Sequence, residues 1–252
     1  MRISNTGVGH HPEIVSWLLQ RETLEVRYPK GYTYIDKTGL IAEEVCARFP
    51  DFELEEANVG RTQLVNRKGA ADIHYGVNRA AVGADIEFLS QRTYFEYCAF
   101  FFPALFNEVG IKTLTRVGNR TVFHRKFDSV RDARGFVNGV ARTNGGRVPI
   151  LSDVGEPIQE RQITEFLLRF EDEKLGFLIR LLTGTSGVEL QGPHVEQFQA
   201  KLPPATPVAI LDVDVYTAQT MAVEVLVPEE FVKSNLKMIE ARVIPLLKAT
   251  GA

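Results

Sequence analysis

Cysteine is nearly absent from this 252-residue chain, which contains only Cys46 and Cys98. Both lie in apolar patterns of helical spacing, where a free thiol behaves as a small hydrophobic side chain. No Cys-x-x-Cys pair occurs, so the sequence offers neither a thiol zinc site nor a dithiol redox motif. We therefore expect two buried free thiols and no disulfide.

Long hydrophobic runs and a charge excess are also lacking. The most apolar stretch, residues 94–106, is too short and too interrupted to cross a bilayer. The N-terminus has no basic region followed by an apolar core, as a signal peptide would. The 29 basic and 32 acidic residues give a formal net charge of −3. The sequence therefore predicts a soluble cytoplasmic protein without a membrane segment, and its acidity disfavours nucleic acid as a partner.

What is present is the ordinary composition of a folded domain, with 44% hydrophobic and 24% charged residues. Residues 1–20 are interpreted as an N-terminal lead-in, with a short helix expected over residues 12–20. Residues 21–110 show the order strand, helix, three strands, helix. The expected elements of this half are 23–28, 36–49, 52–57, 61–66, 71–86 and 90–109. Residues 111–252 show a similar order, strand, helix, three or four strands, helix. Their expected elements are 112–127, 129–141, 161–171, 175–183, 208–217, 221–227 and a helix from residue 228.

This order predicts an α+β fold made of two similar β-α-β-β-β-α halves. The halves can join their edges into one curved antiparallel sheet, with long helices packed on one face and the other face open as a saddle or cleft. The two sequences are not visibly repeated, so the internal duplication depends on the order of elements alone. Because such architectures serve several unrelated functions, the fold by itself does not predict the activity.

Polar side chains on two of the expected strands form the candidate site. Alternation places the polar residues of strand 112–127 on one side, and those of strand 208–217 on one side as well. The candidate ligand-binding residues are Arg116, Arg120, His124, Asp212, Asp214 and Tyr216. The arginines can hold a phosphate or carboxylate by paired hydrogen bonds, and the aspartates can bind a divalent metal or act as acid and base. Alternatively, these residues form cross-strand ion pairs on a solvent-facing sheet, each contributing about 0.2–1 kcal/mol.

No recognisable catalytic motif accompanies these residues. The glycine-rich segments 7–9 and 144–146 do not stand between a strand and a helix, as a phosphate-binding loop would. A Gly-x-Ser-x-Gly nucleophile motif is missing, and the histidines lack metal-binding spacing. The sequence therefore identifies no catalytic residue, no metal site and no cofactor, and it favours a binding protein over an enzyme.

Two short motifs resemble a known family. Residues 116–120 read Arg-Val-Gly-Asn-Arg, and residues 211–216 read Leu-Asp-Val-Asp-Val-Tyr, followed by the last helix. The chain resembles the sporadically distributed bacterial proteins of similar length known only as a family of unknown function, over its C-terminal three quarters. It departs from them at residues 121–123, where members usually have an aromatic residue and then asparagine. The resemblance implies no activity, but the patchy distribution of the family implies mobile or defence-related genes.

Three functional hypotheses follow. The first is a binding or interaction protein that holds a small anionic ligand or a protein partner on the open sheet face. The second is a metal-dependent enzyme acting on a phosphorylated substrate or nucleic acid, with Asp212, Asp214 and Glu165 on the metal and Arg116 and Arg120 on phosphate. The third is a nucleic-acid binder that uses the saddle, which the acidity disfavours. The oligomeric state is left open.

Overall fold

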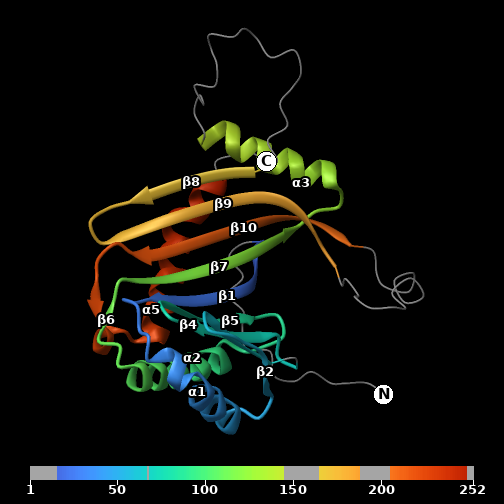
Figure 1. The fold of residues 1–252 in the computed structure, drawn as a ribbon. Helices are drawn as coiled ribbons and strands as arrows, with labels where there is room; N and C mark the ends of the chain where they lie inside the picture. Colours follow the sequence, from blue (N-terminus) through green and yellow to red (C-terminus); the bar gives the residue numbers. More distant parts are fainter. Residues whose placement is uncertain (1–15, 67, 145–164, 188–204, 249–252) are drawn as a thin grey trace, which may run out of the picture.

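The computed structural model describes residues 16–66, 68–144, 165–187 and 205–248. They form an α+β fold around one nine-stranded antiparallel sheet (Figure 1). In chain order, its strands are β1 (Leu18–Arg27), β2 (Phe52–Ala57), β3 (Arg61–Asn66), β4 (Ala71–Gly76), β5 (Arg79–Asp85), β7 (Arg116–Lys126), β8 (Glu165–Glu171), β9 (Leu175–Ser186) and β10 (Thr206–Thr217). Across the sheet, the order is β2-β3-β4-β5-β1-β7-β10-β9-β8. The predicted fold class and large antiparallel sheet are confirmed.

Helices cover one face of this sheet. They are α1 (Tyr34–Arg48), α2 (Gln91–Val109), α3 (Val130–Asn144), α5 (Pro228–Met238), a π-helical turn (Ile239–Val243) and α6 (Ile244–Lys248). The short strands β6 (Thr113–Leu114) and β11 (Met221–Ala222) pair in a second, small sheet. All these helices pack into a single core against one face of the large sheet. Within the described residues, no helix is long and apolar enough to cross a membrane.

The two central strands, β1 and β7, begin the two halves of the chain. They pair with each other in antiparallel orientation, and each is flanked by the last sheet strand of its own half, β5 or β10. The first half contains one strand more than predicted, because residues 71–86 form the hairpin of β4 and β5 and not one strand. The buried positions move from odd numbers in β4 (Ala71, Ile73, Tyr75) to even numbers in β5 (Ala80, Val82). This change of phase marks the turn at residues 77–78.

Two other predicted elements are wrong. The helix expected over residues 12–20 lies partly outside the described residues, and its described end, Leu18–Gln20, belongs to β1. Trp17 and Leu19 are both buried, so the apolar positions follow the period of a strand. The strand expected over residues 221–227 is limited to β11 and is followed by a 3₁₀ turn, Val223–Val225.

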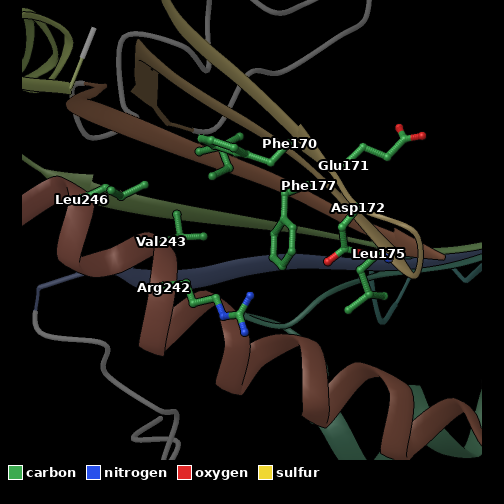
Figure 2. Close-up of a pocket in the computed structure, with 9 residues that line it drawn as sticks. Phe170, Glu171, Asp172, Leu175, Phe177, Arg242, Val243 and Leu246 are labelled. Atoms are coloured by element: carbon green, nitrogen blue, oxygen red, sulfur yellow. Dashed lines mark hydrogen bonds between the residues drawn. The ribbon is translucent and has the colours of Figure 1, made fainter. Parts of the chain in front are cut away.

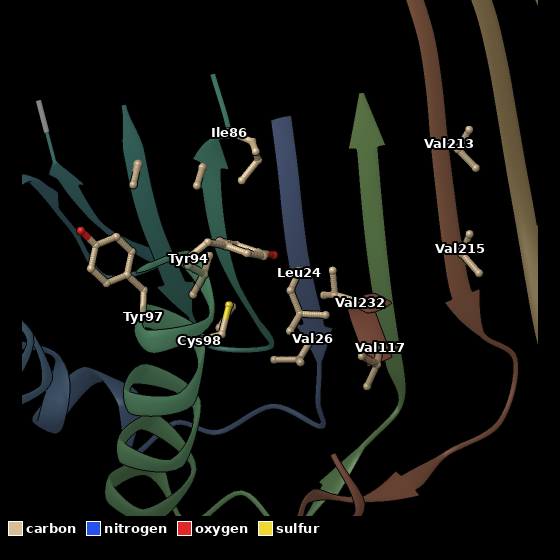
Figure 3. Close-up of a cluster of buried hydrophobic side chains, with 14 of the residues drawn as sticks. Leu24, Val26, Ile86, Tyr94, Tyr97, Cys98, Val117, Val213, Val215 and Val232 are labelled. Carbon is tan, nitrogen blue, oxygen red and sulfur yellow. The ribbon is translucent and has the colours of Figure 1, made fainter. Parts of the chain in front are cut away.

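The core lies between the covered face of the sheet and helices α2 and α5. Ser90 caps α2 by accepting a hydrogen bond from the backbone N–H of Thr93 at 3.2 Å. Gly110 ends the helix with a φ of 77°, which favours glycine. Figure 3 shows Tyr94 and Cys98 of α2 beside Leu24 of β1. Cys98 is buried as expected, whereas Cys46 is half-buried, and both thiols are free.

Candidate ligand-binding face

The predicted arginines and aspartates meet on the face of the sheet opposite this core. Arg116 Nη2 lies 2.5 Å from Asp214 Oδ2. Arg120 binds Asp212 through two hydrogen bonds of 2.8 and 2.7 Å. The register places Arg120 directly opposite Asp214, so Arg120 reaches diagonally to Asp212, two residues along β10. Arg116 reaches back along β10 to Asp214 from beyond its last paired position, Gly118 opposite Tyr216. The predicted sharing of one face by these four residues is therefore confirmed.

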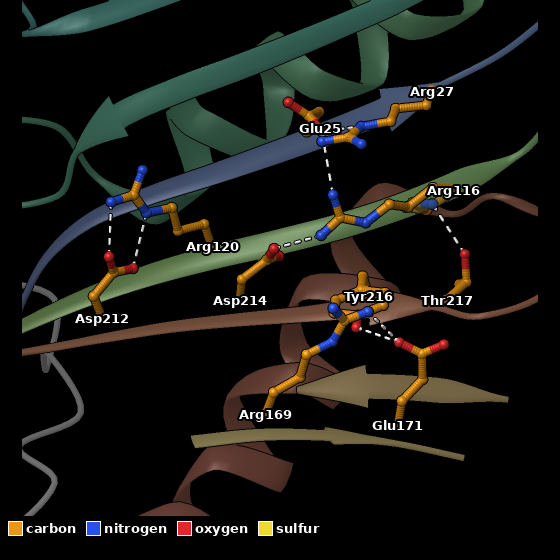
Figure 4. A network of polar contacts seen from close by, with 11 residues as sticks. Glu25, Arg27, Arg116, Arg120, Arg169, Glu171, Asp212, Asp214, Tyr216 and Thr217 are labelled. Carbon is orange, nitrogen blue, oxygen red and sulfur yellow. Dashed lines mark hydrogen bonds and ion pairs between the residues drawn. The ribbon is translucent and has the colours of Figure 1, made fainter. Parts of the chain in front are cut away.

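Arg116 is the centre of a larger group, which we call the central network: Glu25, Arg116, Asp214, Tyr216 and Glu171 (Figure 4). The Arg116 guanidinium lies 4.3 Å from the centroid of the Tyr216 ring and 3.7 Å from Glu25. Tyr216 donates a hydrogen bond of 2.7 Å to Glu171 on β8. The network thus links β1, β7, β10 and β8 across the sheet.

Two glycines leave room for the side chains of this network. A Cβ atom at Gly176 would lie 2.2 Å from the Tyr216 ring, and one at Gly118 would lie 3.1 Å from Asp214 Oδ1. The ring therefore lies over β9, where any other residue would displace it. Burial raises the pKa of Asp214 above its ordinary value, although Arg116 favours the charged carboxylate. The charge of Asp214 thus depends on Arg116.

His124 shares the face but not the network. It lies at the other end of β7, opposite Leu18 and Ile210, and its Nδ1 has no hydrogen-bond partner among the described residues. Burial lowers the pKa of His124, which favours the neutral ring. The structure therefore does not bring His124 together with the other predicted site residues.

The metal-dependent alternative lacks its third ligand. Glu165, which was expected to join Asp212 and Asp214, forms an ion pair of 3.0 Å with Arg180. In the described parts of the chain, no group of three or more histidine, cysteine, aspartate or glutamate residues could hold a metal ion. The two aspartates are instead occupied by Arg116 and Arg120, as in the ion-pair interpretation of the sequence.

A depression beside the central network was not predicted. Its volume is about 330 Å³, and it is lined from β3, β4, β5, β1 and β7. We call it the arginine depression; its charged lining is Arg21, Glu25, Arg61, Asp72, His74, Arg79 and Arg120. β4, β5 and β1 separate β3 from β7 in the sheet, so the arginine depression spans five neighbouring strands. It lies on the open face on the side of the first half.

The carboxylates of the arginine depression are paired. Asp72 contacts Arg21 and lies 2.5 Å from Nε2 of His74. Burial opposes ionisation of Asp72, but His74 and Arg21 outweigh it and lower the pKa of this carboxyl. Arg61 Nη2 lies 2.9 Å from Nδ1 of His74. Arg79 forms no ion pair with an acidic residue of the described chain, so the lining carries an excess of positive charge.

A local signal for these residues exists in the sequence. Arg61 and Gln63 alternate along β3, and Asp72 and His74 alternate along β4, so each pair shares the open face. The search for metal-binding spacing among the histidines did not find this group, because His74 pairs with an aspartate two residues away on the same strand face. That β3 and β7 contribute to the same hollow follows from the sheet order, which has no local signal.

No protein-family model matches the chain, and a search of curated proteins found no relative.

Proposed function

We propose that the protein is a binding protein that holds a small anionic ligand, bearing a phosphate or carboxylate group, in the arginine depression. The observation that carries the proposal is the convergence of four arginines on one hollow that contains only two carboxylates. Glu25 is already paired with Arg27 at 2.8 Å, and Asp72 with Arg21 and His74. The charges of Arg61 and Arg79 are left to attract a ligand.

The chemistry of these groups fits an anion. A guanidinium presents a planar fork of N–H donors that matches the two oxygens of a carboxylate or phosphate. A hollow lined by one sign of charge concentrates its potential on the enclosed space. The volume of about 330 Å³ is that of a small-molecule site, for which roughly 300–1,000 Å³ is typical.

The pair of Arg120 and Asp212 supports the same site from one side. Arg120 lines the depression and is fixed by its two hydrogen bonds to Asp212. Asp212 is buried, so Arg120 presents its remaining N–H groups from a defined position. In this proposal, the predicted Arg–Asp pairs act as supports for the ligand-binding wall, and Arg61 and Arg79 on the far wall make the direct contacts.

The test is a thermal-unfolding screen against inorganic phosphate, pyrophosphate, nucleotides and dicarboxylates. A ligand at about 100 times its dissociation constant stabilises the folded state by roughly 2.7 kcal/mol, a shift of about 5 to 11 °C for a chain of this size. We expect the double variant Arg61→Gln/Arg79→Gln to abolish the shift, because it removes both direct cations and leaves the core unchanged.

Arg92→Gln is the matched control, because Arg92 is an exposed arginine of α2 on the other side of the sheet. It should keep the shift in full. A shift that persists in the double variant would place the ligand elsewhere, and a panel without any ligand would contradict the proposal. Retention of DNA with a steep salt dependence would instead favour the saddle as a nucleic-acid surface.

We also propose that the chain belongs to the sporadically distributed bacterial family that its motifs resemble, with the defence-related context and the cytoplasmic location expected from the sequence. The two motifs are short, but their charged residues pair with each other across β7 and β10, which supports the proposal that they form one unit. The similar order of elements in the two halves supports an internal duplication, with β1 and β7 as equivalent strands.

A further inference from the structure

The edge strand β8 is unusually well suited to pair with another strand. It forms the upper edge of the sheet in Figure 1, and its pairing with β9 runs without a bulge from Glu165 to Glu171. Leu167 and Phe170 are 53% and 51% exposed, on opposite faces of the strand. A regular edge strand with exposed apolar side chains is a template for strand addition.

The other edge of the sheet is built differently. The strand β2 carries Glu53, Glu55 and Glu56, and its pairing with β3 is interrupted by an irregularity between Leu54 and Glu56. Acidic side chains and bulges are the features with which proteins block edge-to-edge association. Both edges carry an exposed leucine, Leu54 on β2 and Leu167 on β8. They differ because β2 is bulged and its charges are all negative, whereas β8 is regular and carries charges of both signs, which can pair with a second copy.

The backbone groups that β8 offers can be identified from its hairpin. The N–H of Asp172 donates to the carbonyl of Leu175 at 2.9 Å, so the backbone groups of Asp172 face β9. Backbone direction alternates along an antiparallel strand. Residues with even numbers from 166 to 170 therefore bond to β9, and Glu165, Leu167 and Arg169 direct their N–H and C=O groups outward.

We propose that a second copy of this chain adds to β8, in an antiparallel two-fold pairing of the two β8 strands centred on Leu167. In this register, Leu167 lies opposite its own equivalent, and Glu165 of each copy lies opposite Arg169 of the other. All three are the residues whose backbone groups point outward, so the pairing satisfies both chains.

The side chains on both faces of β8 also favour this register. On the open face, it forms two opposite-charge pairs, Glu165 with Arg169 in each direction, which directly opposed strand positions favour. On the helix-covered face, Phe166 lies opposite Leu168 of the other copy. A register centred on Leu168 would instead oppose Glu165 and Glu171, two like charges, so charge complementarity selects Leu167 as the centre.

This pairing would continue the sheet across the two copies. A two-fold axis perpendicular to the sheet keeps the faces aligned, so both arginine depressions would open on the same side. The inference is independent of the proposed function, because β8 contributes no residue to the arginine depression.

The experiment measures the mass of the protein in solution by light scattering over a range of protein concentrations. The same measurement is made on variants in which the charges of Glu165 and Arg169 are reversed. The wild-type chain should reach twice its mass of 28.2 kDa. Arg169→Glu opposes like charges at both pairs and should give the monomer, and so should Glu165→Arg. The double variant Glu165→Arg/Arg169→Glu restores opposite charges and should recover the dimer.

The two single variants also provide an internal control. Mixed in equal amounts, they should form a heterodimer, since every Arg of one copy then faces a Glu of the other. An unchanged far-ultraviolet circular dichroism spectrum of each variant would show that the fold is intact, and the wild type, but neither single variant, should unfold at a temperature that rises with protein concentration. A wild-type chain that stays monomeric at all concentrations, or single variants that remain dimeric, would overturn the proposal.

Discussion

Glu22→Gln should raise the free energy of unfolding by about 3 kcal/mol at pH 8 and leave it nearly unchanged at pH 4.5. Glu22 belongs to β1 but faces the helix-covered side, where it is completely buried. Burial raises the pKa of Glu22 to about 7, although a hydrogen bond from Gln91 of 3.4 Å opposes the rise. Glutamine resembles the protonated carboxyl and cannot ionise.

The direction of this pH dependence follows from the number of protons that Glu22 binds in the folded and in the unfolded state. An unfolded glutamate has a pKa near 4.5, so between pH 4.5 and pH 7 the folded protein retains a proton that the unfolded chain has released. The contribution of Glu22 to stability is therefore fully present below pH 4.5, is lost as the pH rises to about 7, and stays absent above it.

Denaturant unfolding of both proteins between pH 4.5 and pH 8 measures this effect. The wild-type stability should fall across the window, and the variant should lack that part of the decline. Glu96→Gln, on the exposed side of α2, is the control and should follow the wild type. Parallel pH profiles for Glu22→Gln and the wild type would show that Glu22 is ionised in the folded protein.

Arg116→Met should destabilise the protein by about 2–3 kcal/mol at neutral pH. Arg116 and Asp214 are each 22% exposed, and burial already raises the pKa of Asp214. Without the guanidinium, Asp214 keeps its desolvation cost and loses its counter-ion, so its pKa rises further. Protonation then relieves the cost, and the loss of stability should become smaller as the pH falls.

A double-mutant cycle separates this pair from the loss of packing against Tyr216. Arg116→Met/Asp214→Asn removes both charges and should recover most of the lost stability. Arg92→Met, which breaks an exposed pair on α2, should change the stability little. If the double variant is as unstable as Arg116→Met, the cation–π contact with Tyr216 is the larger contribution.

The composition of the open face was predictable because strand alternation is a local property. Arg116 and Arg120 on β7, and Asp212 and Asp214 on β10, share one side as their spacing indicated. Whether they would bind a ligand or each other was left open, because it depends on the register between two strands almost a hundred residues apart. The register places each arginine within reach of a carboxylate, and the ion pairs follow.

The hairpin of β4 and β5 shows where local reasoning fails. Each strand alternates regularly, and only the change of the buried side chains from odd positions, up to Tyr75, to even positions, from Ala80, reveals the turn. The short helix expected near Trp17 failed for a related reason: a few apolar residues satisfy a helical and a strand period equally well. Pairing with β7 decided the outcome by extending β1 to Leu18.

By itself, the sequence determined which side chains each strand presents on its two faces, and that one face would be apolar enough to need helices. The reason is that successive side chains of a strand point to opposite faces, so the alternation depends only on neighbouring residues. Only the tertiary structure decided which strands lie together. The arginine depression is lined by Arg61 of β3 and Arg120 of β7 because the sheet order places β3, β4, β5, β1 and β7 side by side. That order depends on contacts between residues far apart in the chain.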